Sequence, residues 1–205
     1  KVFVKTEAIR YGKVKKAILK YADKGKIVIY CTRICDVEDM RDYLIEDCDI
    51  EADEIAICHS KLSNRAKQEQ RFRSGKAHIM IATSAFSMGI DVPDIELVVH
   101  FNAPISMTDY IQQIGRAGRD GRKAHCVLFY DQNGDDDAIS NSFIKKAKKQ
   151  SPKAAKVIKA KLSQVHDFIH SDSCMVCDIL EYQGQHEVKT CKRCTVCARK
   201  RRSSK

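Results

Sequence analysis

Short apolar segments separated by amphipathic helical segments constrain the fold of this chain most strongly. Five β-branched or apolar runs are expected to form strands: Lys26–Cys31, Ile55–His59, His78–Thr83, Leu97–Asn102 and Cys126–Asp131. Helical patterns lie between them, near Lys13–Lys24, Val37–Cys48, Asn64–Ser74 and Ser106–Gln113. Strands that are apolar throughout predict an α/β fold, a parallel sheet with helices on both faces. In such a sheet, ligands bind beyond the carboxyl ends of the strands, and we expect the polar motifs there.

The segment after residue 134 has a different, helical character. The turn at Asn133-Gly134-Asp135 predicts a boundary between a first domain, residues 1–134, and a small helical domain, residues 135–198. Ser151 and Pro152 suit the N-cap and the first position of a helix. The apolar residues of that helix form one stripe that favours packing: Ala154, Ile158, Leu162, Val165 and Ile169. Residues 199–205 are predicted to be a basic, disordered tail.

Positive charge is concentrated in the C-terminal third of the chain. Residues 1–140 carry 21 lysines and arginines against 22 acidic residues, whereas residues 141–205 carry 16 against 5. This imbalance predicts a polyanionic partner, although a solvated helix face and a tail would give the same pattern. No segment approaches the roughly 18 unbroken apolar residues of a membrane span, and no secretory signal opens the chain. A soluble intracellular protein without a membrane partner is therefore expected.

The segment Tyr110–Arg122, YIQQIGRAGRDGR, carries the strongest chemical signal. Arg116 and Arg119 place two guanidinium groups close together on a backbone that glycines keep tight, so that a polyphosphate can approach. A planar, permanently charged guanidinium suits the charge that develops on a transferred γ-phosphoryl group. The same arginines could instead pair with Asp109 and Asp120 in a purely structural role.

This string, Q-x-x-G-R-A-G-R-D-G, resembles motif VI of superfamily 2 helicases in the form typical of RecQ DNA helicases. Other segments resemble further motifs of that family in the same order: IVIYCTRICDVEDMRDYL from Ile27, HSKL from His59, ATSAFSMGID from Ala82 and HFNAP from His100. The resemblance covers about residues 25–200. It implies the second RecA-like lobe of an ATP-dependent 3′–5′ DNA helicase, whose partners are DNA and a first RecA-like lobe.

The resemblance also implies roles for individual residues. It makes Arg119 the arginine finger, Arg116 a second phosphate contact and Gln112 the motif glutamine. The residues implied on the nucleotide side are Gly89, Asp91, Gly115, Arg116 and Arg119. The residues implied as DNA-backbone contacts are Arg33, Ser60, Lys61, Thr83 and Asn102.

Five of the ten cysteines lie close together near the C-terminus. Cys174, Cys191, Cys194 and Cys197 resemble the four ligands of the RecQ zinc module, a closed set that predicts a structural Zn²⁺. Cys177 could take the place of Cys174, because it lies three residues further along a predicted helix. The resemblance favours Cys174, since Tyr182-Gln183-Gly184-Gln185 follows it where the family carries a similar turn.

Two motifs of a complete helicase do not occur in the sequence: a GxxxxGK[ST] loop and a DExH carboxylate pair. ATP and Mg²⁺ are therefore expected to be bound mainly by a first lobe outside this chain, and the chain alone is expected to be inactive. A truncated, non-enzymatic module that binds DNA or a protein remains an alternative, and an RNA helicase is a third. The basic run Arg199–Arg202 predicts a nuclear location in a eukaryote, and otherwise the cytoplasm or nucleoid.

Overall fold

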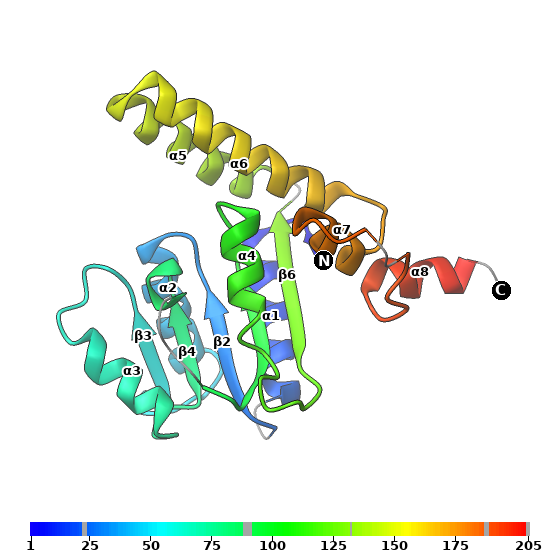
Figure 1. Ribbon diagram of the computed structural model, residues 1–205. Helices are drawn as coiled ribbons and strands as arrows, with labels where there is room; N and C mark the ends of the chain where they lie inside the picture. The colour runs from blue at the N-terminus through cyan, green and yellow to red at the C-terminus, as the bar shows by residue number, and fades with distance from the viewer. Residues whose placement is uncertain (22–23, 88–91, 132, 187–188, 204–205) are drawn as a thin grey trace.

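The computed structural model describes residues 1–21, 24–87, 92–131, 133–186 and 189–203, which contain one six-stranded sheet (Figure 1). Its strands are β1 (Val2–Val4), β2 (Lys26–Tyr30), β3 (Ile55–Cys58), β4 (Ile79–Ala82), β5 (Ile95–His100) and β6 (His125–Asp131). The strands lie in the order β1-β6-β5-β2-β4-β3, and every neighbouring pair is parallel. All the carboxyl ends therefore meet at one edge, which lies at the top in Figure 1.

Helices follow most strands and continue beyond the sheet. In the first part of the chain they are α1 (Glu7–Tyr21), α2 (Ile34–Glu46), α3 (Arg65–Arg73), the 3₁₀ turn η1 (Ser84–Ser87) and α4 (Met107–Ile114). After β6 the chain forms α5 (Asp135–Gln150), α6 (Pro152–His170), α7 (Met175–Tyr182) and α8 (Thr195–Ser203).

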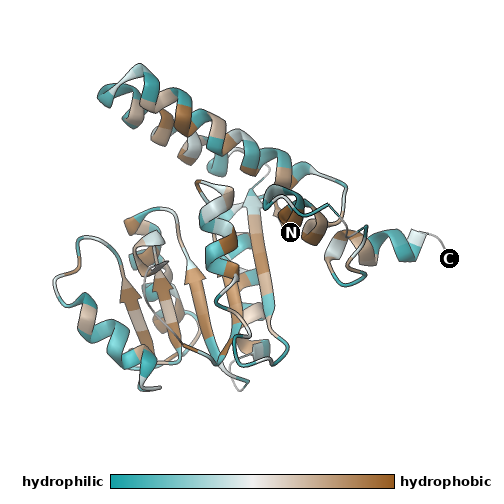
Figure 2. Cartoon of the chain, viewed as in Figure 1, coloured by the Kyte–Doolittle hydropathy of each residue, from teal (hydrophilic) through white to brown (hydrophobic). Residues whose placement is uncertain are grey.

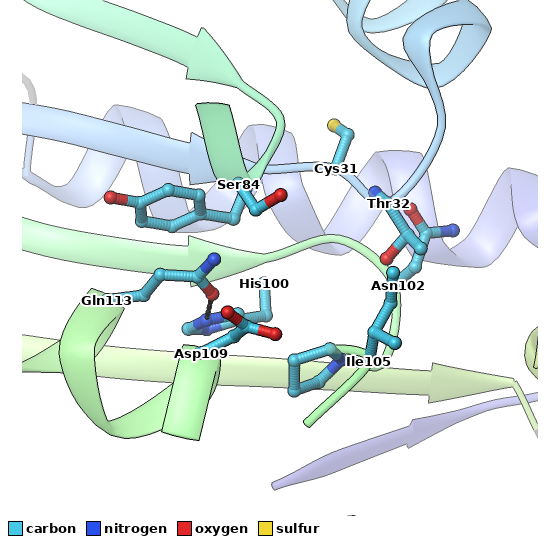
Figure 3. A pocket seen from close by; sticks show the side chains of 10 residues that line it. Cys31, Thr32, Ser84, His100, Asn102, Ile105, Asp109 and Gln113 are labelled. Carbon is cyan, nitrogen blue, oxygen red and sulfur yellow. Dashed lines mark hydrogen bonds between the residues drawn. The ribbon is translucent and has the colours of Figure 1, made fainter. Parts of the chain in front are cut away.

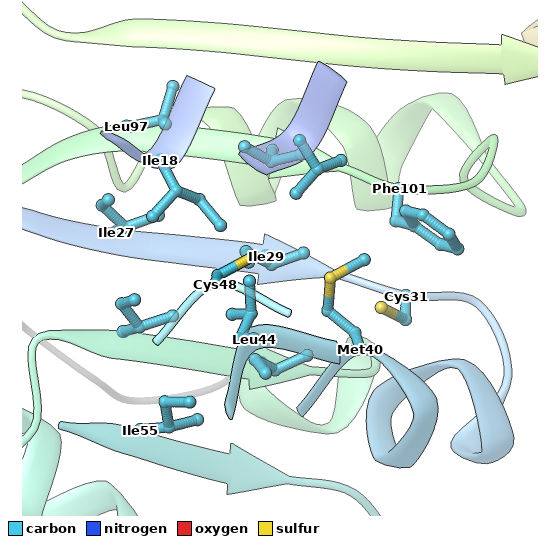
Figure 4. Close-up of a cluster of buried hydrophobic side chains, with 14 of the residues drawn as sticks. Ile18, Ile27, Ile29, Cys31, Met40, Leu44, Cys48, Ile55, Leu97 and Phe101 are labelled. Atoms are coloured by element: carbon cyan, nitrogen blue, oxygen red, sulfur yellow. The ribbon is translucent and has the colours of Figure 1, made fainter. Parts of the chain in front are cut away.

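Both faces of the sheet are buried, because successive side chains of each strand point to opposite sides. On β2, Ile27 and Ile29 join a core cluster with residues of α1 and α2, among them Ile18 and Leu44 (Figure 4). Val28 belongs instead to a second cluster on the other face, which includes residues of α3 and η1. This two-sided burial confirms the predicted parallel α/β fold, and it explains why the strands are apolar throughout.

The five predicted strands are all present, but the N-terminal region was incompletely predicted. Val2–Val4 forms a sixth strand that pairs in parallel with β6, with Val2 opposite Phe129. A three-residue strand is too short to show a period in the sequence. Helix α1 also begins at Glu7, six residues before the predicted start at Lys13.

A buried arginine joins α1 to the end of β6 and the start of α5. The Arg10 side chain is fully buried, its guanidinium lies over the Phe101 ring, and its Nη2 donates to Asp136 Oδ2 at 3.0 Å. Asp131 and Asp135 lie 3.7 Å and 3.4 Å from the same guanidinium. Losing one partner of a buried ion pair costs roughly 3–5 kcal/mol, so this contact fixes where the helical region starts relative to the sheet.

The helical region packs against the sheet through its later turns. Ser151 caps α6 by accepting the Ala154 N–H at 3.0 Å, with Pro152 in the first turn, which confirms that prediction. From the predicted stripe, Val165 and Ile169 pack against Tyr110 of α4 in a third apolar cluster.

The basic tail differs from its prediction. Arg199–Arg202 were expected to be disordered but lie in α8, and Arg199 binds Asp172. None of the described helices has the length and apolar character that crossing a membrane requires.

One buried histidine links the sheet to α4. His100, at the end of β5, stacks on Tyr30 with ring centroids 5.5 Å apart, and its Nε2 lies 2.8 Å from Gln113 Oε1. Burial lowers the pKa of His100 from 6.5 to about 4, although the contact with Gln113 opposes this change. The ring is therefore neutral in the folded protein at neutral pH, and its Nε2–H donates to Gln113.

We expect this histidine to make the fold sensitive to mild acid. Between pH 6.5 and 4 the unfolded chain binds a proton at residue 100 that the folded chain does not. The neutral His100 therefore contributes about 3 kcal/mol to the free energy of unfolding. This contribution is complete above pH 6.5 and is lost as the pH falls toward 4. Urea unfolding at several pH values should give a shallower pH dependence for His100→Gln than for the wild type. His166→Gln, a change at an exposed histidine, is the control. Equal slopes in all three proteins would contradict the assignment.

Candidate functional site

Polar residues predicted to contact DNA form a row along the carboxyl edge of the sheet. Arg33 follows β2, Ser60 follows β3, Thr83 follows β4 and Asn102 follows β5. These four strands are neighbours in the order β5-β2-β4-β3, so the sheet brings the four loops together. The expected location at the carboxyl edge is correct for these residues.

Asn102 is not exposed at this edge, although it was predicted to contact DNA. Its side chain is 1% exposed, and its Oδ1 accepts the Thr32 N–H at 3.2 Å. The Thr32 hydroxyl in turn donates to the Ala103 carbonyl at 3.0 Å. In this structure Asn102 therefore holds the loops after β2 and β5 together through Thr32.

The other predicted DNA contacts differ in their exposure and in whether they bind other residues of the chain. The Arg33 guanidinium binds Asp36 through Nε, with Nη2 2.5 Å from Asp36 Oδ1, and this contact closes the start of α2. Hydrogen bonding to Asp36 raises the pKa of Arg33, so its charge is permanent. Ser60 and Lys61 are exposed in the turn after β3, and Thr83 is half-buried. Ser60 and Lys61 are thus the most accessible of the set.

A small open pocket lies at this edge, between the ends of the strands and α4 (Figure 3). Its polar lining residues include Thr32, Ser84, His100, Asn102, Asp109 and Gln113. Among these, His100 and Gln113 lie next to each other and are joined by their hydrogen bond (Figure 3). The pocket is therefore lined both by residues at the carboxyl edge of the sheet and by residues of α4, the helix that precedes the two arginines.

Helix α4 positions that motif. Ser106 caps the helix by accepting the Asp109 N–H at 3.0 Å, and His100 holds Gln113 near its end. Gln113 is buried, whereas the neighbouring Gln112, predicted to be the motif glutamine, is exposed. The sequence did not identify Gln113 or His100 as an interacting pair. The sequence signal for this pair was weak, because two adjacent glutamines, Gln112 and Gln113, do not indicate which of them is buried.

The glycine-rich loop after α4 requires its glycines. Gly118 has φ +66°, and a Cβ there would lie 2.7 Å from the Arg122 carbonyl oxygen. Its N–H donates to the Ile95 carbonyl at 3.0 Å, at the amino end of β5. The loop therefore lies along a face of the sheet and not beyond the carboxyl ends, where the polar motifs were expected. The Gly118 backbone lies there because the chain after α4 runs back along the strands, whereas the charges of Arg116 and Arg119 still act on Tyr30, the last residue of β2.

The two predicted nucleotide-binding arginines differ in exposure. Arg116 is buried, at 5% exposed, and Arg119 is exposed with its Nε donating to the Gly115 carbonyl at 3.2 Å. Burial raises the pKa of Tyr30, and the nearby charges of both arginines lower it in part. Both guanidinium groups therefore lie near Tyr30, on the face of the sheet that α4 covers.

The carboxylates that could have made these arginines purely structural have other partners. Asp109 accepts the Ser106 hydroxyl at 2.6 Å, and Asp120 binds Arg122 at 2.7 Å. Gly89 and Asp91, predicted on the nucleotide side, lie outside the described residues.

Four cysteine sulfurs of the helical region lie together. Cys174, Cys191, Cys194 and Cys197 have their Sγ atoms within 4.8 Å of one another. Two of these separations, Cys191 to Cys197 and Cys174 to Cys194, are 3.9 Å and 4.0 Å. Thiolates bound to one zinc ion at about 2.3 Å in a tetrahedron lie about 3.8 Å apart.

The backbone around these sulfurs suits negative charge. The N–H groups of Cys191, Cys194 and Cys197 donate to the Sγ atoms of Cys174, Cys191 and Cys194, at 3.2, 3.2 and 3.4 Å. Burial opposes ionisation of Cys174, but such hydrogen bonds lower its pKa below the usual value. The residues present therefore fit a tetrahedral zinc ion. Cys177 is not in the group, so the geometry selects the set with Cys174.

Comparison with known proteins identifies the lobe. The model of the helicase conserved C-terminal domain matches residues 10–121, more than half of the chain. The chain is 37% identical to the ATP-dependent DNA helicase RecQ of Bacillus subtilis over 65% of this chain and 22% of that protein. It is 30% identical to RecQ of Haemophilus influenzae over 86% of this chain and 28% of that protein. It is also 34% identical to the putative ATP-dependent RNA helicase R290 of Acanthamoeba polyphaga mimivirus, over 88% of this chain and 32% of that protein.

Solved structures support the same fold. S. cerevisiae Dbp5 bound to RNA and ADP BeF3 superposes with a TM-score of 0.57 at 22% identity, covering 78% of this chain and 44% of that chain. The chain spans 22% to 32% of the length of the three curated relatives named above. It belongs to the helicase conserved C-terminal domain family and fits the second RecA-like lobe of RecQ DNA helicases.

Proposed function

We propose that this chain is the second motor lobe, with a structural zinc module, of an ATP-dependent 3′–5′ DNA helicase. Arg119 acts as the arginine finger, Arg116 is a second phosphate contact, and a first lobe supplies the phosphate-binding loop and the Mg²⁺ ligands. When ATP is bound between the lobes, its γ-phosphoryl group is the group transferred to water.

The observation that carries the proposal is the exposed Arg119 beside the buried Arg116. The tight turn at Gly118 lies between them, and the difference in burial supports different roles for the two guanidinium groups. The buried one is held near Tyr30, and the exposed one leaves its Gly115 carbonyl to reach a phosphate on a facing lobe. A rigid loop with one exposed arginine suits a site that forms only when two lobes close.

The carboxyl edge supplies the proposed DNA track. The exposed Ser60 and Lys61 contact the phosphate backbone directly, and Thr83 does so through its hydroxyl at the end of β4. Arg33 contributes charge from its place at the start of α2, and Asn102 keeps the loops in position. The edge connects to the arginine loop through His100 and Gln113, so a shift at one is transmitted to the other through α4.

The proposal predicts a large effect at Arg119. In the protein that carries both lobes, Arg119→Ala should lower DNA-stimulated ATP hydrolysis by roughly 10³-fold or more, since arginine fingers contribute 10³–10⁵. Binding of a fluorescent ATP analogue should change little, because the finger acts on the charge of the transition state. Arg119→Lys should stay impaired, because an ammonium lacks the planar fork.

Arg41→Ala is the matched control, since Arg41 is an arginine on α2 whose ion pair with Asp42 is exposed. It should keep wild-type turnover. Near-normal hydrolysis by Arg119→Ala would exclude the finger role. The chain of residues 1–205 alone should show no ATPase activity with or without DNA.

The zinc module gives a second prediction. The purified chain should hold one zinc ion, and Cys174→Ser and Cys191→Ser should lose it, whereas Cys177→Ser and Cys35→Ser should keep it. Removing zinc with a chelator should increase hydrogen exchange in α7 and α8 and leave β2, β4 and β5 protected, because the metal couples to local folding. Full zinc content in Cys174→Ser, or unchanged exchange after zinc removal, would contradict a structural site of these four ligands.

A further inference from the structure

The second half of α5 and the first half of α6 carry a high density of positive charge. Between residues 138 and 166 the sequence has no aspartate or glutamate. The lysines of this stretch, which we call the lysine tip, are Lys145, Lys146, Lys148, Lys149, Lys153, Lys156, Lys159 and Lys161. All eight side chains are exposed. This stretch therefore holds half of the sixteen basic residues of the C-terminal third.

Nothing in the described part of the chain neutralises these charges. None of the eight lysines makes an ion pair or a side-chain hydrogen bond with another described residue. Several of them also repel each other, because Lys145 and Lys149 are four residues apart and Lys153 and Lys156 are three apart. A stretch selected only for helix stability would place carboxylates at these spacings. The uncompensated charge points to an external anion.

The spacing along α6 suits a polymer of regularly placed anions. Lys153, Lys156 and Lys159 recur every three residues, so they rise about 4.5 Å per step and wind around the helix by about 60° per step. Each strand of a DNA duplex carries one phosphate for about every 3.4 Å along the axis. Lysine side chains are flexible enough to match those two spacings over a few contacts.

The fold holds the lysine tip away from the packed core and on the side of the DNA track. The third apolar cluster takes Val165, Phe168 and Ile169 from the last turns of α6, and none of its members lies between residues 141 and 164. Figure 1 shows the α5–α6 hairpin running over the carboxyl edge of the sheet and projecting past it. Its outer end is largely hydrophilic in Figure 2.

We propose that the lysine tip binds the sugar–phosphate backbone of a nucleic-acid duplex, outside the single-strand track at the carboxyl edge. This inference rests on the proposed function, because it takes the edge to be that track. A duplex is favoured over a single strand because its charge density is higher and neutralising it releases more counterions. It is favoured over an acidic protein because the lysine tip offers charge with little apolar area, whereas protein interfaces need a buried apolar centre.

The test compares two variants with the same net charge. The tip variant replaces Lys148, Lys149, Lys153 and Lys156 with glutamine, which keeps the helix propensity. The control variant replaces four exposed lysines elsewhere with glutamine: Lys5, Lys16, Lys20 and Lys24. Fluorescence anisotropy measures binding of the 205-residue chain to a labelled 20-base-pair DNA duplex and to one of its single strands over a range of salt concentrations. Circular dichroism checks that each variant is folded.

The tip variant should bind the duplex about tenfold or more weakly, with a salt slope shallower by about 2–4, since each lost phosphate contact removes about 0.9. The control variant should change duplex affinity less than twofold, and both variants should bind the single strand as the wild type does. Unchanged duplex binding by the tip variant, or an equal loss in the control variant, would overturn the inference.

Other results would separate the duplex assignment from the proposed function. An equal loss on single strand and duplex would overturn the duplex assignment, as would polyglutamate displacing the wild type as readily as duplex DNA at equal charge. A wild-type chain that binds neither DNA would overturn the proposed function as well as the lysine tip. If the wild type binds single strands and the tip variant binds the duplex as well as the wild type does, the lysine-tip inference fails and the proposed function stands.

Discussion

Burial of both faces of a parallel sheet is the constraint on which the rest of this structure depends. Because Ile27 and Val28 of β2 already face two different cores, polar side chains can gather only where the strands end or on helices that return across a face. The edge row of Arg33, Ser60 and Thr83 uses the first option. The arginine loop after α4 uses the second. The positions of the two sites in the proposed function, the carboxyl edge and the arginine loop, therefore follow from the burial of both faces of the sheet.

Helix α4 connects those regions, because it begins at the carboxyl edge and the loop that follows it reaches the amino end of β5. His100 anchors it at Gln113, and Gly118 is tied to the Ile95 carbonyl. Burial lowers the pKa of His100 and keeps its imidazole uncharged. The contact with Gln113 is therefore a hydrogen bond from a neutral ring. At the same carboxyl edge, Arg10 binds Asp136 and so fixes the start of α5, from which the helical hairpin projects.

Much of this fold could be predicted from the sequence, because short, continuously apolar strands and the Ser151-Pro152 cap are local patterns. The resemblance to motif VI also predicted roles for Arg116 and Arg119. The strand Val2–Val4 could not be predicted, since its stability comes from pairing with β6. The buried state of Asn102, the His100–Gln113 pair and the helical state of Arg199–Arg202 depend equally on tertiary contacts. The four-cysteine set was predicted from the family resemblance, which favoured Cys174 over Cys177, and the structure brings the sulfur of Cys174 into the group.

The central claim is that this lobe supplies an arginine to a phosphate held by a facing lobe. A structure of the protein with both lobes, bound to DNA and to ADP with beryllium fluoride, tests it most directly. The Arg119 guanidinium should lie within about 2.7–3.2 Å of the fluoride that stands in for the γ-phosphate. An Arg119 that still binds its own Gly115 carbonyl, with the lobes closed on the nucleotide, would contradict it.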